Sequence, residues 1–463
     1  MLVFCLSAFA IEASATATIL IDPGVGFNDA TVPKVGQKGN NPGNTLGELR
    51  TNLFQEAANV WGAILNSTVP ITIKAKFEPF GLDECVSASI QLGHAGPTNI
   101  YSNFGSGDAN IAYPVSLAES LSATNLNGGT AEIDAAFNSR VDTDPDCLGK
   151  GGFYYGLDDN APDGTTALFA TVLHEMGHGL GFLSYVNPDG SLPTGNIDTF
   201  SRLLMDLQTG MNWSGMTNLE RSNSMLNEPS LVWTGAKVTA DRAMHLNPEA
   251  EVRINSPAPI ANTFEAAFGE QSAAVPVGGV TAGVIDGDAA QADVCQQDFD
   301  SSFAGKIILY DSAACTASTL AVFSEFWNAA GVIVAATSGI GLPDMTGLIG
   351  NVIAIPYIGV SKSVADDLRA NLGAVNVTIL NSAIKLIGEN QGKLKMYAPS
   401  AFQQGSSVSH WSKTASPDLL MEPTLGDLTY QNVDLTAAAF RDIGWSVNIP
   451  GGVVEVIYRD GFE

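Results

Sequence analysis

The sequence predicts an α+β fold in which one unit is interrupted by an inserted α/β domain. Three observations predict it: residues 19–163 alternate short apolar runs with turns, residues 255–382 alternate strands with helices, and residues 391–447 return to loops followed by one helix. The expected domain boundaries are 18–250 for the first part of the outer unit, 251–385 for the insert, 386–447 for the second part and 448–463 for a C-terminal tail.

Two strands and one helix are predicted early in the outer unit. Residues 69–75 alternate apolar and polar side chains, which is typical of a strand with one buried face, and residues 130–137 are a second strand candidate. Residues 52–65 carry apolar side chains at helical spacing and predict an amphipathic helix.

A second helix is predicted from about residue 165 to residue 180, where an apolar stripe recurs every three or four positions. Asp163 or Thr165 can accept hydrogen bonds from the free N–H groups at its start. Gly181 is expected to end it, because glycine adopts a positive φ without steric cost.

The insert is predicted to be a compact α/β unit of about 130 residues. The expected strands are 306–310, 332–336 and 352–355, the expected helices are 318–330 and 364–372, and a last helix over 434–443, ended by Gly444, follows the insert.

Charge and hydropathy exclude several classes of function. The chain of 463 residues has 21 Lys and Arg against 48 Asp and Glu, a formal net charge of −27. Such a surface repels phosphate backbones and anionic lipids, so nucleic-acid binding and polybasic membrane docking are not expected. No apolar run approaches the roughly 18–20 residues of a membrane-spanning helix.

The N-terminus predicts export. Residues 1–11 are apolar, and the small residues of 13–17 resemble a signal-peptidase site, so residues 1–17 are expected to be a signal peptide. The usual positive charge before the apolar run is missing, and a buried N-terminal strand is the alternative. A secreted or periplasmic location follows from the first interpretation.

Four cysteines remain after Cys5 leaves with the signal peptide: Cys85, Cys147, Cys295 and Cys315. Three pairings are possible, and proximity in sequence favours Cys85–Cys147 and Cys295–Cys315. Four free thiols or a cysteine metal site are the alternatives, although no C-x-x-C spacing is present.

The segment His174-Glu175-Met176-Gly177-His178 carries the strongest chemical signal. Residues four apart share one face of a helix, so both imidazoles can reach one metal ion. Glu175 lies beside them and can act on water as a base. The pattern predicts a zinc site with a catalytic glutamate.

A catalytic zinc usually has three protein ligands, so a third is expected outside this helix. His94 lies in a turn-like stretch far upstream and is interpreted as a surface residue, and His245 is a weaker candidate. His410 is favoured, because Met421 follows it by eleven residues in a turn closed by proline.

A carboxylate such as Asp198 or Asp206 is the alternative third ligand. It would leave Gly181 and the pair of His410 and Met421 without a role.

The set His174, Glu175, His178, Gly181, a long insertion, His410 and Met421 resembles the leishmanolysin-like branch of the metzincin zinc metallopeptidases. The resemblance is specific over residues 165–182 and 405–445. In compact metzincins the third ligand lies three residues after the glycine, a position that Ser184 occupies here, whereas the leishmanolysin-like branch delays it by an inserted segment.

The resemblance implies a metzincin-like catalytic domain in which His174, His178 and His410 bind one Zn²⁺ and Glu175 is the catalytic acid and base. Met421 would form the hydrophobic floor, the Met-turn, beneath the metal. Some metzincins use a tyrosine two residues after this methionine, but Pro423 stands there.

Residues 299–372 resemble a protease-associated (PA) domain. The similarity lies in residues 302–311, Cys315, residues 329–334 and residues 355–361, which follow the pattern of that domain in order. Such domains are not catalytic, and the resemblance implies a role in substrate access or protein interaction.

We therefore expect a secreted zinc metalloendopeptidase that acts on protein or peptide substrates. The alternative is a secreted, non-catalytic binding protein on a degenerate peptidase scaffold. Calcium has no firm support: residues 157–160 are acidic, but solvated acidic turns are common without an ion.

Overall fold

The computed structural model describes residues 16–81, 85–86, 89–144, 147, 151–158, 160–290, 301–311, 315–339, 341–345, 353–424 and 433–448. The chain divides into two compact units, one from residues up to 246 together with residues from 388 onward, and one from residues 247–387. The predicted insert, 251–385, falls within the second unit. Nearly all of the predicted signal peptide and C-terminal tail lies outside the described residues.

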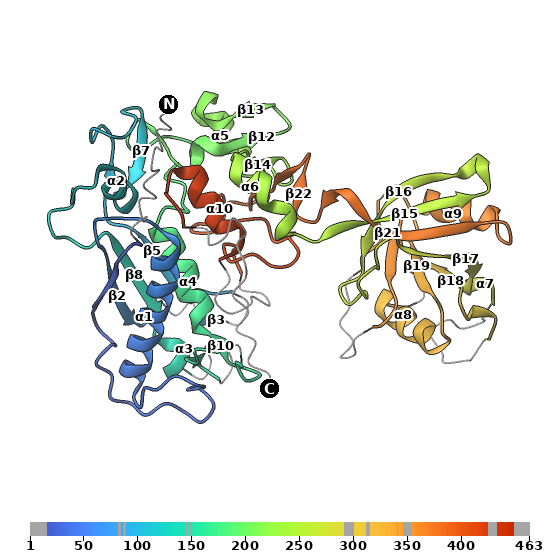
Figure 1. Ribbon diagram of the computed structural model, residues 1–463, viewed down its shortest axis with the longest axis horizontal. Helices are drawn as coiled ribbons and strands as arrows, with labels where there is room; N and C mark the ends of the chain where they lie inside the picture. The colour runs from blue at the N-terminus through green and yellow to red at the C-terminus, as the bar shows by residue number, and fades with distance from the viewer. Residues whose placement is uncertain are drawn as a thin grey trace, which may run out of the picture. The chain divides into compact units, whose positions relative to one another are not determined.

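The first unit is built on a four-stranded sheet in the order β1-β2-β8-β5 (Figure 1). Its strands are β1 (Ile19–Pro23), β2 (Ile71–Glu78), β8 (Ile133–Asn138) and β5 (Gly93–Pro97). The first three run parallel, whereas β5 pairs antiparallel with β8 and forms the edge. Alternating burial along β2 agrees with the period-two pattern of its sequence.

Helix α1 (Leu46–Ile64) begins six residues before the predicted start. Thr45 causes the difference, because its side chain accepts a hydrogen bond from Glu48 N and caps the first turn. The apolar stripe of the helix, including Leu53 and Trp61, is fully buried.

Helix α4 (Leu168–Gly179) carries the H-E-x-x-H segment. The predicted caps at Asp163 and Thr165 are wrong: Ala167 precedes the helix without a side-chain cap, and the Thr165 hydroxyl donates instead to Pro162 O at 2.6 Å. Strand β10 (Thr166–Ala167) pairs in this stretch, so the helix begins only after it.

Helices α1 and α4 contact each other and the sheet, so they form one layer against it (Figure 1). Trp61 Nε1 donates to Leu173 O at 3.1 Å, which joins the two helices. Gly179 lies directly against Ile133 of β8, where a side chain would clash. Eleven of the residues of α4 are buried, so this helix lies inside the unit.

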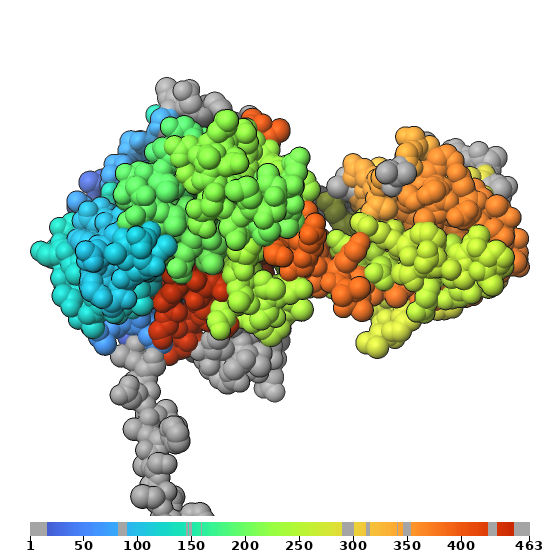
Figure 2. All heavy atoms as spheres, turned by 90° about the horizontal axis from the view of Figure 1, so that it is seen from above, coloured from blue at the N-terminus to red at the C-terminus, as the bar shows by residue number. Residues whose placement is uncertain are grey.

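Helix α10 (Asp434–Ile443) has the bounds that the sequence predicted, and Gly444 follows it with a φ of +122°. Trp445 Nε1 donates to Leu180 O at 3.0 Å, which ties the end of α10 to the end of α4. In Figure 2 the red residues of this C-terminal segment lie among the blue and green residues of the N-terminal part. The unit is therefore closed by both parts of the chain.

Shorter elements complete the first unit. They are β3 (Cys85–Val86), β4 (Ser89–Ile90), β6 (Ile100–Tyr101), β7 (Ile111–Pro114), α2 (Val115–Ser122), α3 (Arg140–Thr143), β9 (Phe153–Tyr154), β11 (Ile197–Asp198), β12 (Leu204–Asp206), β13 (Met211–Asn212), α5 (Asn218–Ser224), β14 (Leu231–Trp233), α6 (Ala236–Asp241), β22 (Glu389–Asn390) and β23 (Lys393–Leu394).

The second unit is a closed barrel in the strand order β15-β16-β20-β19-β18-β17-β21. Its elements are β15 (Pro248–Ser256), β16 (Asn262–Phe268), β17 (Val280–Asp286), α7 (Gly287–Ala290), β18 (Ile307–Asp311), α8 (Ala317–Phe326), β19 (Gly331–Ala335), β20 (Tyr357–Val360), α9 (Lys362–Ala370) and β21 (Asn376–Leu386). Aliphatic side chains such as Val252, Ile333 and Ile358 form one of its two cores.

The mixed α/β character predicted for the chain is present in both units. One strand prediction is wrong: β20 lies at 357–360 instead of 352–355. Residues 353–355 belong to no strand, and Ile353 packs into a second core that includes Trp327. Among the described residues, no helix combines the length and apolar character that crossing a membrane requires.

Cys147 and Cys315 each take part in a disulfide bond, in the first and the second unit respectively. The predicted pairings involve the side chains of Cys85 and Cys295, which lie outside the described part of the chain. The connectivity therefore stays a prediction.

Candidate metal centre

Three histidine side chains meet within the first unit. Their Nε2 atoms form a small triangle: His174 to His178 is 3.1 Å, His178 to His410 is 3.1 Å and His174 to His410 is 3.2 Å. The three residues are the group that the described part of the chain offers as metal ligands. Two come from successive turns of α4, and the third comes from a loop more than two hundred residues later.

Each imidazole is oriented by a backbone carbonyl. His174 Nδ1 lies 2.6 Å from Leu420 O, His178 Nδ1 lies 2.7 Å from Phe182 O, and His410 Nδ1 lies 2.7 Å from Ser406 O. A carbonyl oxygen only accepts hydrogen bonds, so each Nδ1 carries the proton. In the neutral ring, Nε2 then presents a free lone pair toward the other two rings.

Burial keeps these rings neutral. It lowers the pKa of His174 to about 4 and, together with the nearby His174, that of His178 to about 3. Burial and the two neighbouring histidines place the pKa of His410 well below its usual value. Near neutral pH the site therefore presents three unprotonated nitrogen atoms.

This arrangement fits a zinc ion. Three lone pairs facing one another repel unless a cation lies between them. Three nitrogen ligands at about 2.0–2.1 Å from a tetrahedral zinc are about 3.3–3.4 Å apart, close to the observed separations. Carbonyl partners on the far ring nitrogens are the usual second contacts of metal-binding histidines.

Met421 packs against helix α4. It is fully buried, and a Cβ atom added at Gly177 would lie 2.8 Å from its Sδ atom. Gly177 lies between His174 and His178 on α4, so the absence of a side chain there lets the methionine pack against this turn of the helix. The predicted role of Met421 as a floor beneath a metal stays a prediction.

The histidine from the late segment reaches the site beside Ser184. Ser184 N donates to Ser409 Oγ at 3.1 Å, and Ser184 Oγ lies 2.7 Å from Ser201 Oγ. Ser409, the residue before His410, is hydrogen-bonded to Ser184, so this contact joins the late loop to the segment that follows α4.

The alternative carboxylate ligands are used elsewhere. Asp198 accepts hydrogen bonds from the N–H groups of Tyr185, Phe200 and Ser201. Asp206 accepts from Gln208 N, Thr209 N and Asn227 Nδ2. Both shape turns, and neither belongs to the histidine group, so the carboxylate interpretation is not supported by the geometry.

The two remaining histidines lie away from the triangle. His94 is exposed, as the sequence analysis expected, and its ring stacks on Phe80. It lies on strand β5, however, and not in the turn that was predicted there. His245 follows a short 3-10 helix, Arg242–Met244, and interacts electrostatically with Asp434.

Glu175 lies between α4 and the edge of the sheet. Its side chain is buried, and its carboxylate accepts a hydrogen bond from the backbone N–H of Ala95 in β5. Burial is the main cause that raises the pKa of this carboxyl to about 8. The carboxylate stands next to the histidine pair in sequence without joining the triangle.

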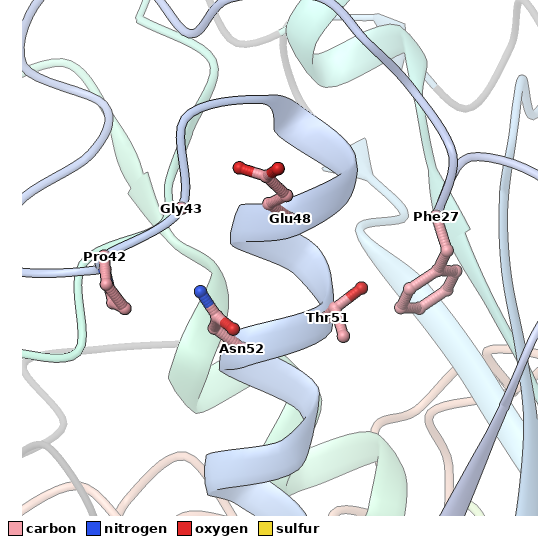
Figure 3. Close-up of a pocket in the computed structure, with 6 residues that line it drawn as sticks. All are labelled: Phe27, Pro42, Gly43, Glu48, Thr51 and Asn52. Atoms are coloured by element: carbon pink, nitrogen blue, oxygen red, sulfur yellow. The ribbon is translucent and has the colours of Figure 1, made fainter.

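A pocket of about 300 Å³ lies elsewhere in the first unit, at the start of α1 (Figure 3). Glu48, Thr51 and Asn52 of the helix and Phe27 of the preceding loop line it. Glu48 already accepts a hydrogen bond from Asn44 N, and Asn52 donates to Asn41 Oδ1. None of the predicted site residues lines this pocket.

Sequence reasoning named the three clustered histidines and missed the groups that orient them. The carbonyls of Leu420, Phe182 and Ser406 belong to the backbone, so the residue types at these positions do not indicate the contacts. Asp434 was recognised only as the start of a helix, although its carboxylate accepts from Leu420 N at 2.5 Å.

No family model and no curated protein matches the chain. Solved structures match parts of it, and the chain spans about a third of the length of those it matches. BSAP, a zinc aminopeptidase from Bacillus subtilis, is 22% identical over 32% of this chain and 35% of its own, with a TM-score of 0.23. A peptidase M28 precursor from Shewanella amazonensis is 20% identical over 30% and 34%, with a TM-score of 0.25. The subtilisin-like protease Apa1 from Pseudoalteromonas sp. AS-11 is 15% identical over 32% and 35%, with a TM-score of 0.23.

Proposed function

We propose that the protein is a zinc-dependent metalloendopeptidase of the metzincin type, similar to the leishmanolysin-like branch. The observation that carries the proposal is the triangle of three Nε2 atoms whose rings are held in one tautomer by backbone carbonyls. Glu175 and Met421 supply the catalytic carboxylate and the floor that such a site requires.

His174, His178 and His410 would hold the metal through Nε2. A zinc ion bound there supplies Lewis acidity, which polarises a peptide carbonyl and makes water a better nucleophile near neutral pH. In its ionised form, the Glu175 carboxylate would take a proton from the attacking water and deliver it to the nitrogen of the departing amine. Glu175 is thereby returned to its ionised form at the end of each cycle.

We further propose that the substrate binds as an extended strand along β5. Among the described residues, this strand pairs only with β8, and its N–H at Ala95 already contacts the Glu175 carboxylate. An extended peptide can add to a sheet edge through main-chain hydrogen bonds. Binding along its length suits cleavage within a chain, which is why we favour an endopeptidase.

The second unit is proposed to be a PA-type domain that acts in substrate access or protein interaction. Its support is the closed barrel with α8 between β18 and β19 and α9 between β20 and β21, in the order of the sequence pattern. It contributes none of the three clustered histidines.

Export is proposed from the N-terminal pattern and the disulfides. Disulfide-bonded Cys147 and Cys315 suit an oxidising compartment. We expect the mature chain to begin after Ala15 or Ala17, as N-terminal sequencing of protein recovered outside the cytoplasm will show. Recovery of the chain with residues 1–15 intact from the periplasm or medium would contradict a cleaved signal peptide.

Metal dependence is the direct test of the proposed function. We expect about one zinc per purified chain and hydrolysis of casein that stops with 1,10-phenanthroline and returns when zinc is added back. Hydrolysis that survives complete removal of zinc would exclude the mechanism. Zinc binding without hydrolysis of any member of a peptide library would favour the alternative, a binding protein on a degenerate scaffold.

A further inference from the structure

The backbone of the turn at residues 419–422, which contains Met421, is held at almost every polar group by a partner. Glu422 N donates to Leu419 O at 3.0 Å, which closes the turn, and Trp411 N donates to Met421 O at 2.9 Å. Leu420 O lies 2.6 Å from His174 Nδ1. The turn is thus bonded on one side to a predicted ligand and on the other to the residue after His410.

Two buried carboxylates hold consecutive amides of the same turn. Glu422 Oε1 accepts from Leu419 N at 3.0 Å, and Asp434 Oδ2 accepts from Leu420 N at 2.5 Å. Both side chains are 4% exposed. The other oxygen of Asp434, Oδ1, accepts from the N–H and the hydroxyl of Thr436 at 3.1 Å each, so helix α10 fixes this carboxylate in place.

Resting on the proposed zinc site, we propose that Asp434 and Glu422 are positioning residues that set the 419–422 turn and, through Leu420 O, the orientation of the His174 ring. The chain of contacts is continuous: carboxylate to Leu420 N–H, Leu420 carbonyl to Nδ1, and Nε2 to the metal position. A carboxylate is needed at Asp434, because both of its oxygens accept from backbone N–H groups. An amide has only one acceptor oxygen, so Asn would direct an NH₂ group at one of those donors.

The chain offers a matched control on the same helix. Asp442 also accepts with both oxygens, from Lys237 N, Val238 N and Trp233 Nε1. Asp442→Asn therefore removes a comparable set of hydrogen bonds without touching the 419–422 turn. Comparing it with Asp434→Asn separates a loss of positioning from a general loss of stability.

Glu422 provides a second pair that does not depend on Asp434→Asn folding. Burial raises the pKa of Glu422 to about 8, so its neutral form is well populated near pH 7 and Gln resembles it. Glu422→Gln keeps an acceptor for Leu419 N, whereas Glu422→Ala removes it. We therefore expect Glu422→Gln to bind zinc more tightly than Glu422→Ala.

The experiment measures zinc affinity of the full chain by competition with a chromophoric chelator, together with amide hydrogen exchange of the metal-free protein. We expect Asp434→Asn to weaken zinc binding about 10–100-fold, the range for partners that orient a ligand. We expect Asp442→Asn to stay within about twofold, as for a site independent of the metal. Exchange at Leu419 and Leu420 should rise in Asp434→Asn and Glu422→Ala only.

Zinc affinity of Asp434→Asn equal to that of Asp442→Asn, with unchanged exchange at Leu420, would overturn the inference. Equal affinities of Glu422→Ala and Glu422→Gln would remove Glu422 from it. A parent chain that takes up no zinc at all would overturn the proposed function and this inference together. A parent chain that binds zinc while the variants behave alike would overturn this inference alone.

Discussion

Glu175→Ala and Glu175→Gln are expected to lower kcat/KM for peptide hydrolysis by about 10³-fold, because each removes the group that accepts the proton of water. Zinc content should stay at the parent level, since Glu175 does not belong to the group of candidate metal ligands. Gln keeps an oxygen that can accept the Ala95 N–H, so a loss in that variant reports the missing base. The measurements are initial rates on a quenched peptide and zinc by atomic emission.

Glu132→Gln is the control for this result. Glu132 is also buried and also accepts a backbone N–H, from Thr72, but it directly precedes strand β8 and carries no proposed role. We expect it to keep its activity. Unchanged cleavage by Glu175→Gln would refute the role of Glu175.

His410→Ala is expected to weaken zinc binding at least about 100-fold, more than the loss of an orienting partner, because a ligand itself is removed. His245→Ala should lower zinc affinity much less than His410→Ala, since His245 lies outside the triangle and interacts with Asp434 instead. Zinc retained per chain after dialysis against a weak chelator ranks the two variants. A larger loss in His245→Ala would overturn the choice of third ligand.

His94→Ala extends this comparison. His94 is exposed on the edge strand β5, close to the proposed path of the substrate. We expect normal zinc content, so any change in cleavage by this variant would concern substrate binding and leave the ligand assignment intact.

Local pattern was sufficient where neighbours in sequence are also neighbours in space. The spacing of His174 and His178 places both rings on one face of α4, and Gly181 follows that helix with a φ of +118°. The bounds of α10 were predicted correctly for the same reason, because its apolar stripe and Gly444 lie within one short segment.

Local sequence pattern misplaced an element where a capping residue or a pairing strand lay outside the segment that carries the pattern. The start of α1 was placed too late, because the cap at Thr45 precedes the apolar stripe. The start of α4 was placed too early, because residues 166–167 pair with Phe153–Tyr154 as a short strand. The strand expected at 352–355 was displaced to 357–360, where pairing with β19 and β16 selects the register.

The sequence by itself determined two histidines a helical turn apart with a glutamate beside them, and it favoured His410 as a third candidate. Only the tertiary structure brings His410 next to that pair, because convergence across more than two hundred residues depends on how the late loop packs against Ser184 and Gly177. It also decided that backbone carbonyls set the ring tautomers and that Asp434 and Glu422 hold the turn. Those contacts involve main-chain atoms, which every residue carries, so they cannot be predicted from residue type.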